Sequence, residues 1–106
     1  MVRRRIRVQP AASHRLDDIF RYTRERWGQA QAERYVTGLF AAIEGLLDRS
    51  TPSRPVPAQL GVAGYFFRHQ RHFVYWRELS NGDIGIVTIL HERMHQIDRL
   101  REDFEP

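Results

Sequence analysis

The sequence of 106 residues contains neither cysteine nor lysine. Without cysteine there is no disulfide framework, no thiolate nucleophile and no cysteine-based zinc site, which fits a reducing compartment. No apolar run reaches the ~18–20 residues that a membrane span needs. The opening MVRRRIRV also lacks the apolar core of a signal peptide. We therefore expect a cytoplasmic protein.

All 17 basic residues are arginine, and with 13 acidic residues they give a net charge of +4. Arginine presents a rigid fork to carboxylates and phosphates, so such a surface suits an acidic protein partner or a nucleic acid. A GC-rich genome that encodes Arg in place of Lys explains the same composition. The charge alone is therefore compatible with an anionic partner without identifying one.

Most β-forming residues lie between positions 64 and 95. Residues 84–90 (IGIVTIL) carry no charge and are mostly β-branched, which predicts a central strand buried on both faces. Residues 66–70 and 72–79 alternate aromatic with polar side chains, which predicts two more strands. The dipeptide Asn81-Gly82 favours a type I′ hairpin before the central strand. These strands would form an antiparallel meander.

Near the N-terminus, apolar residues alternate with arginines over residues 2–8. The period of two predicts a further strand, with Ile6 and Val8 facing inward. The row of arginines on its other side would keep an edge strand from pairing with another copy of itself.

Two apolar stripes at helical spacing follow this first strand. Pro10 suits the first position of the first helix, and Gly28 suits a left-handed cap at its end. We expect a helical hairpin with a very short connection and with Trp27 wedged between the helices. The stripes consist of Ala12, Leu16, Ile19, Phe20, Thr23 and Trp27, and of Ala32, Tyr35, Val36, Leu39, Phe40, Ile43, Leu46 and Leu47.

Prolines at positions 52, 55 and 57 exclude a regular helix or central strand from the crossover at residues 49–63. Residues 93–104 show helical spacing and predict a short C-terminal helix or ordered tail. The whole chain, residues 1–106, thus reads as a single α+β domain of order β-α-α-β-β-β. Its helical hairpin would pack on one face of a small antiparallel sheet, and the other face would stay partly open.

The string His91-Glu92-Arg93-Met94-His95 matches the zinc-protease motif H-E-x-x-H. That motif needs both histidines one helical turn apart. Here it continues a predicted strand, in which the two rings would lie roughly 13 Å apart, too far to share a metal. We therefore expect no metal site and no cofactor.

A basic cluster gathers at the predicted strand ends. Arginine and histidine side chains there could hold a phosphate and cleave RNA by general acid-base catalysis. A solvated sheet edge, with His91 hydrogen-bonded to backbone, is the alternative interpretation. The cluster consists of Arg68, His69, Arg71, His72, Arg77, His91 and Arg93.

Several segments, in this order, resemble the ParE toxins of the RelE/ParE toxin-antitoxin superfamily, and the resemblance covers nearly the whole chain. Each segment is a weak match alone, whereas the ordered set is specific. The segments are Arg21-Tyr22-Thr23, Arg26-Trp27-Gly28, Ala30-Gln31-Ala32-Glu33-Arg34-Tyr35, Gly64-Tyr65-Phe66-Phe67-Arg68, Arg71-His72, Tyr75-Trp76-Arg77 and Ile89-Leu90-His91-Glu92-Arg93-Met94.

The resemblance implies a RelE/ParE-like fold and a small toxin that a ParD-like antitoxin neutralises in a hetero-oligomeric complex. ParE-like toxins act on DNA gyrase, whereas RelE-like relatives cleave mRNA on the ribosome. Arg68, His91 and Arg93 would serve the endonuclease alternative. The chain has no Lys and no Tyr after Tyr75, which favours the ParE interpretation, with no catalytic residues of its own.

The residues expected to bind a partner are all arginine, tryptophan or histidine. A toxin fold that has lost potency and persists in a repressor complex with its antitoxin is a third possibility. The expected binding residues are Arg21, Arg24, Trp27, Arg68, Arg71, His91 and Arg93.

Overall fold

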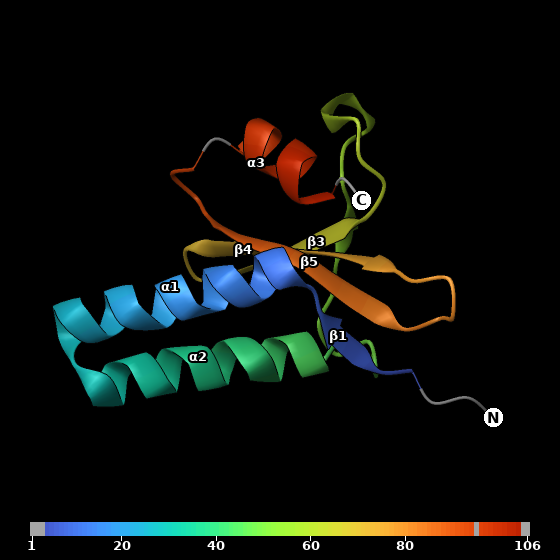
Figure 1. Ribbon diagram of the computed structural model, residues 1–106. Helices are drawn as coiled ribbons and strands as arrows, with labels where there is room; N and C mark the ends of the chain where they lie inside the picture. Colours follow the sequence, from blue (N-terminus) through green and yellow to red (C-terminus); the bar gives the residue numbers. More distant parts are fainter. Residues whose placement is uncertain (1–3, 95, 105–106) are drawn as a thin grey trace.

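The computed structural model describes residues 4–94 and 96–104, which fold as a mixed sheet between two helical layers. Helices α1 and α2 lie side by side on one face of the sheet, and α3 lies on the other (Figure 1). The predicted α+β class, helical hairpin and C-terminal helix are confirmed. The elements are β1 (Ile6–Val8), α1 (Pro10–Trp27), α2 (Gln29–Glu44), β2 (Arg54–Pro55), the 3₁₀ turn η1 (Ala58–Leu60), β3 (Tyr65–His69), β4 (His72–Glu78), β5 (Ile84–His91) and α3 (Gln96–Phe104).

The sheet has the strand order β1-β5-β4-β3-β2. Strands β3, β4 and β5 pair antiparallel, as predicted for the meander. The two-residue strand β2, which was not predicted, pairs antiparallel with β3 at the edge of the sheet. Strand β1 instead runs parallel to β5, with Ile6 opposite Ile84. A parallel pair needs a long crossover, and the helices and strands between β1 and β5 in the chain provide it. None of the described helices is both long and apolar enough to cross a membrane.

The helical hairpin turns at a single residue, Gly28, whose φ of +93° is easy for glycine alone. Pro10 begins α1, where its missing N–H costs no helical hydrogen bond. Trp27 is 62% exposed, so the predicted wedge between the helices is wrong. The corner of the hairpin extends beyond the sheet (Figure 1), which leaves Trp27 without a layer to pack against.

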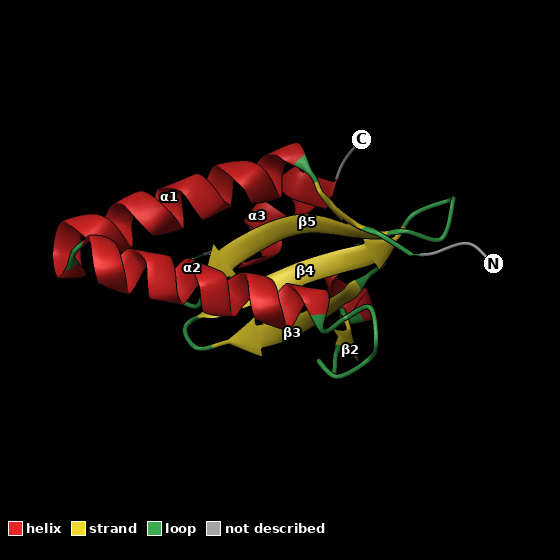
Figure 2. Cartoon of the chain, turned by 90° about the horizontal axis from the view of Figure 1, so that it is seen from below, coloured by secondary structure: helices red, strands yellow, loops and turns green. Residues whose placement is uncertain are grey.

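The core has one apolar cluster on each face of the sheet. Viewed from below, α1 and α2 lie over the strands (Figure 2), and Leu39 and Ile43 belong to the same apolar cluster as Ile86. On the opposite face, α3 packs Leu100 and Phe104 over the strands. This second cluster covers the face that the sequence predicted to be partly open.

Strand β5 is buried at every position from Ile84 to Leu90, as the uncharged run predicted. A β-bulge interrupts its pairing with β4, because Tyr75 faces Thr88 while the next residue, Trp76, faces Ile86. The bulged residue, Val87, is turned to the α3 face and belongs to that cluster.

The loop between β4 and β5 differs from the predicted type I′ turn. Gly82 has a φ of +90°, whereas Asn81 is not among the residues with positive φ. The loop is held by the buried carboxylate of Asp83, which accepts hydrogen bonds from the Arg5 amide (3.0 Å) and the Arg7 Nε (2.9 Å). The Arg7 side chain and the backbone of Arg5, which precedes β1, therefore fasten this strand to the loop.

Val8 is 38% exposed rather than facing the core, so that part of the β1 prediction is wrong, whereas Ile6 does pack against the core. Strand β1 is only three residues long, Ile6–Val8. Its last residue, Val8, lies beside exposed side chains of α1 and α2.

Candidate functional site

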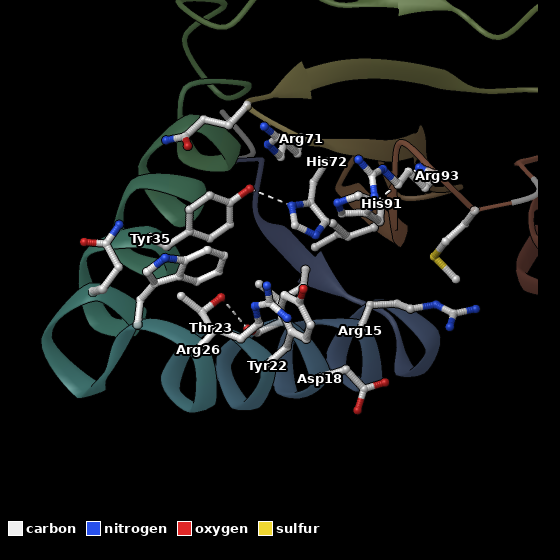
Figure 3. Close-up of a pocket in the computed structure, with 16 residues that line it drawn as sticks. Arg15, Asp18, Tyr22, Thr23, Arg26, Tyr35, Arg71, His72, His91 and Arg93 are labelled. Carbon is white, nitrogen blue, oxygen red and sulfur yellow. Dashed lines mark hydrogen bonds between the residues drawn. The ribbon is translucent and has the colours of Figure 1, made fainter.

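A groove of about 750 Å³ lies between the α1–α2 hairpin and the sheet edge where β4 begins and β5 ends. We call it the arginine groove. Figure 3 shows Arg15 and Arg26 on the helical wall, and Arg71 and Arg93 on the sheet wall. Trp27 also lines this groove.

The floor of the arginine groove contains a Tyr-His pair. The Tyr35 hydroxyl on α2 forms a 2.6 Å hydrogen bond with Nδ1 of His72 on β4 (Figure 3). Burial and the nearby imidazoles of His91 and His69 lower the pKa of His72 to about 4. Burial also raises the pKa of the Tyr35 hydroxyl. At neutral pH both groups are therefore uncharged.

His91 closes β5 beside this pair. Its ring meets the ring of His72 edge-on, with centroids 5.2 Å apart. Its Nδ1 accepts a 3.1 Å hydrogen bond from the Arg93 backbone N–H. His91 thus combines both interpretations drawn from the sequence, since it is bonded to backbone and also lines the groove.

Arg68 points away from the arginine groove. In the strand register Arg68 lies opposite Phe73, and Phe73 lies opposite Leu90, which belongs to the α3 face. His91 lies opposite His72, on the helical face. The Arg68 guanidinium instead forms an ion pair with Glu92 at 2.5 Å.

The expected binding residues therefore divide into two groups. Trp27, Arg71, His91 and Arg93 line the arginine groove. Arg21 lies outside it and pairs with Asp18, whereas Arg24 stacks over Phe20. Arg77, from the basic cluster, lies over the ring of Phe104 on the α3 face.

Arg15, Arg26 and Tyr22 are among the groove residues that were not singled out from the sequence as binding residues. The available signal was the i, i+4 spacing of Tyr22 and Arg26 at the end of a helix, because these positions share one helical face. That signal does not say what the face lies against.

A second, smaller depression of about 320 Å³ runs along the outer side of the hairpin. We call it the hairpin trough. Its exposed apolar residues include Val8 and Phe40, and Phe20 carries the Arg24 guanidinium over its ring at 5.9 Å. The lining residues are Val8, Ser13, Leu16, Asp17, Phe20, Val36 and Phe40.

The zinc-like string cannot be followed to its end, because His95 lies outside the described residues. His91 sits in the last position of a strand, and Glu92 is paired with Arg68 and Arg71. Across residues 4–94 and 96–104, no group of three or more His, Asp or Glu side chains is placed to hold a metal ion.

Comparison with known proteins gives a consistent result. A family model described as "ParE toxin of type II toxin-antitoxin system, parDE" matches residues 6–96. Toxin ParE of Escherichia coli is 34% identical over 87 residues, covering 82% of this chain and 84% of that protein. Toxin ParE1 of Mycobacterium tuberculosis is 32% identical over 95 residues, covering 87% of this chain and 92% of that protein.

The fold also matches a solved structure. A chain described as the chromosomal ParDE TA system from P. aeruginosa superposes with a TM-score of 0.65 at 19% identity. The match covers 84% of this chain and 96% of that chain. With a family model that spans nearly all of the described residues, this chain belongs to the ParE toxin family of type II toxin-antitoxin systems.

Proposed function

We propose that this toxin acts in the cytoplasm as a single domain that inhibits DNA gyrase by binding it. The observation that carries the proposal is the ParE family match over residues 6–96. The toxin would make and break no bond of its own.

The directions of the side chains at the ends of β3 and β5 support a binding protein rather than a nuclease. Arg68 and His91 point to opposite faces of the sheet, so they do not converge on one phosphate. His72, with its pKa lowered to about 4, is a neutral imidazole at neutral pH and not the imidazolium that would serve as a general acid. General acid-base cleavage needs a donor and an acceptor within reach of the same substrate atoms.

A gyrase assay tests the proposal directly. Purified toxin added to gyrase and relaxed plasmid should abolish supercoiling and leave cleaved DNA trapped in a gyrase complex. The same toxin should leave plasmid relaxation by a type I topoisomerase unchanged, which controls for non-specific DNA effects. Full supercoiling in the presence of a large molar excess of toxin would contradict the proposal.

One observation favours the second candidate, a ribosome-dependent endonuclease. His91 and Arg93 lie in one groove with Arg71, which is the combination a phosphate-cleaving site uses. This candidate predicts mRNA cuts in a translation extract that disappear in His91→Ala and persist in His14→Ala, an exposed control on α1. Intact mRNA with the unaltered toxin would exclude it.

For the neutralising partner, we propose that a ParD-like antitoxin lays an acidic amphipathic segment into the hairpin trough. The trough offers exposed apolar side chains such as Phe40 on α2, and Arg21 and Arg24 stand on α1, which forms its other wall. An amphipathic segment gains by burying apolar area there and pairing its carboxylates with these guanidiniums. Arg68 lies on the other face of the sheet, so a segment in the trough would not reach it.

A further inference from the structure

The arginine groove combines positive charge with exposed aromatic rings at its mouth. Tyr22 and Trp27 are 55% and 62% exposed, and their ring centroids lie 6.3 Å apart in an edge-to-face arrangement. The Arg26 guanidinium lies 5.5 Å from both centroids. Large aromatic faces left open to water beside a cation mark a surface built for a partner.

The charge in the groove is almost wholly of one sign. Arg26 and Arg93 form no ion pair with any residue in the described part of the chain, and Arg71 has only a 3.5 Å contact with Glu92. Asp18, a carboxylate that also lines the groove, is paired with Arg21 at 3.4 Å. An occupant of this groove therefore meets several arginines whose charge is not cancelled locally.

The cations are spread along the groove rather than gathered at one point. Arg26 stands at the hairpin corner, Arg71 in the turn between β3 and β4, and Arg93 just beyond β5 (Figure 3). This spread matches a linear polyanion rather than a single compact anion. The exposed rings of Tyr22 and Trp27 lie beside the Arg26 guanidinium, where flat partners can stack.

We propose that the arginine groove binds a single strand of nucleic acid. Its phosphates would pair with Arg26, Arg71 and Arg93, while one or two bases stack on Trp27 and Tyr22. Nucleic-acid strands alternate charge with planar rings, and proteins hold them with such pairs of guanidinium and aromatic side chains. A carboxylate-rich peptide satisfies the charges but leaves the ring faces without a planar partner. This function goes beyond gyrase inhibition and does not depend on it.

Fluorescence anisotropy with a short labelled single-stranded DNA and the complete toxin tests the proposal. The double variant Arg26→Ala/Arg93→Ala should lose affinity by about tenfold or more. The slope of its log affinity against log salt concentration should also be shallower by about 1.5 than that of the unaltered toxin. The matched double variant Arg54→Ala/Arg101→Ala removes the same charge from exposed positions outside the groove. It should change affinity by less than about threefold.

Two further measurements separate stacking from charge. Trp27→Ala leaves the charge unchanged and should still weaken binding by about fivefold or more, because a stacked base is lost. A glutamate-rich peptide of similar length should bind more weakly than the strand. The proposal would be overturned by equal losses of affinity in the two double variants, by an unchanged affinity in Trp27→Ala, or by tighter binding of the peptide than of the strand. The assay contains no gyrase, so its failure leaves the proposed function standing.

Discussion

The Tyr35–His72 pair is the point at which α2 is tied to the sheet beneath the arginine groove. Burial lowers the pKa of His72 to about 4, below its ordinary 6.5. The unfolded chain therefore takes up a proton that the folded chain does not. Stability contributed by neutral His72 is present above pH 6.5 and is lost as pH falls from 6.5 towards 4.

We expect the free energy of unfolding to fall by about 2 kcal/mol through this window because of His72, after allowance for its partial exposure. His72→Gln keeps a hydrogen-bond acceptor for Tyr35 without titrating, so urea unfolding should depend less on pH. His14→Gln, at an exposed position of α1, should behave like the unaltered protein. An unchanged pH dependence in His72→Gln would contradict this assignment.

Asp83 is a buried carboxylate that holds β1 to the loop between β4 and β5. The hydrogen bond from the Arg7 guanidinium, with those from the Arg5 amide and Asn81, holds the pKa of this carboxyl below its ordinary value. Asp83→Asn removes the charge opposite Arg7 and should lower the thermal midpoint by about 5 °C or more. Glu78→Gln, which breaks the exposed pair with Arg4, should shift the midpoint much less. Equal shifts would show that the charge of Asp83 is not what holds β1.

At the scale of elements, Leu100 anchors α3 to the sheet, because its side chain is completely buried in the cluster between α3 and the strands. Leu100→Ala leaves a cavity against Val87 and Leu90 and should cost about 2–4 kcal/mol in chemical unfolding. Hydrogen exchange should show α3 losing protection first, since it is a short, terminal element. The exposed control Arg101→Ala should cost only a few tenths of a kcal/mol.

Strand β5 was predictable because a run of uncharged β-branched residues suits burial on both faces. The bulge at Val87 was not predictable, because it depends on how β4 pairs across from it. The parallel pairing of β1 is likewise set by the path of the whole chain. Trp27 continues the apolar spacing of α1 but lies past the edge of the sheet, so periodicity alone placed it wrongly.

At the scale of the whole molecule, the candidate site was predicted only in part. Arg71, His91 and Arg93 could be identified because strand ends gather side chains at one edge of a sheet. Arg15 and Arg26 could not, since they come from a helix far away in the chain that meets this edge only in the folded protein. Arg68 was grouped with Arg71 because the two are close in the sequence. The alternation of side chains along β3 turns Arg68 to the opposite face of the sheet.

The two depressions use different sides of α1. Ser13, Asp17 and Phe20 line the hairpin trough, whereas Arg15 and Tyr22 line the arginine groove. An occupant of one therefore need not exclude an occupant of the other. Changes confined to the trough should affect the antitoxin alone.

Phe40→Glu places a charge in the apolar trough, where Phe40 is 37% exposed. The purified variant should bind antitoxin about 30-fold more weakly, since an exposed aromatic anchor is replaced by a group that repels an acidic segment. In cells it should arrest growth as the unaltered toxin does, and antitoxin co-expression should no longer restore growth. Arg54→Glu, on the short edge strand β2, is the control and should remain neutralised. If Phe40→Glu still arrests growth and is rescued as well as the control, the antitoxin does not use the trough.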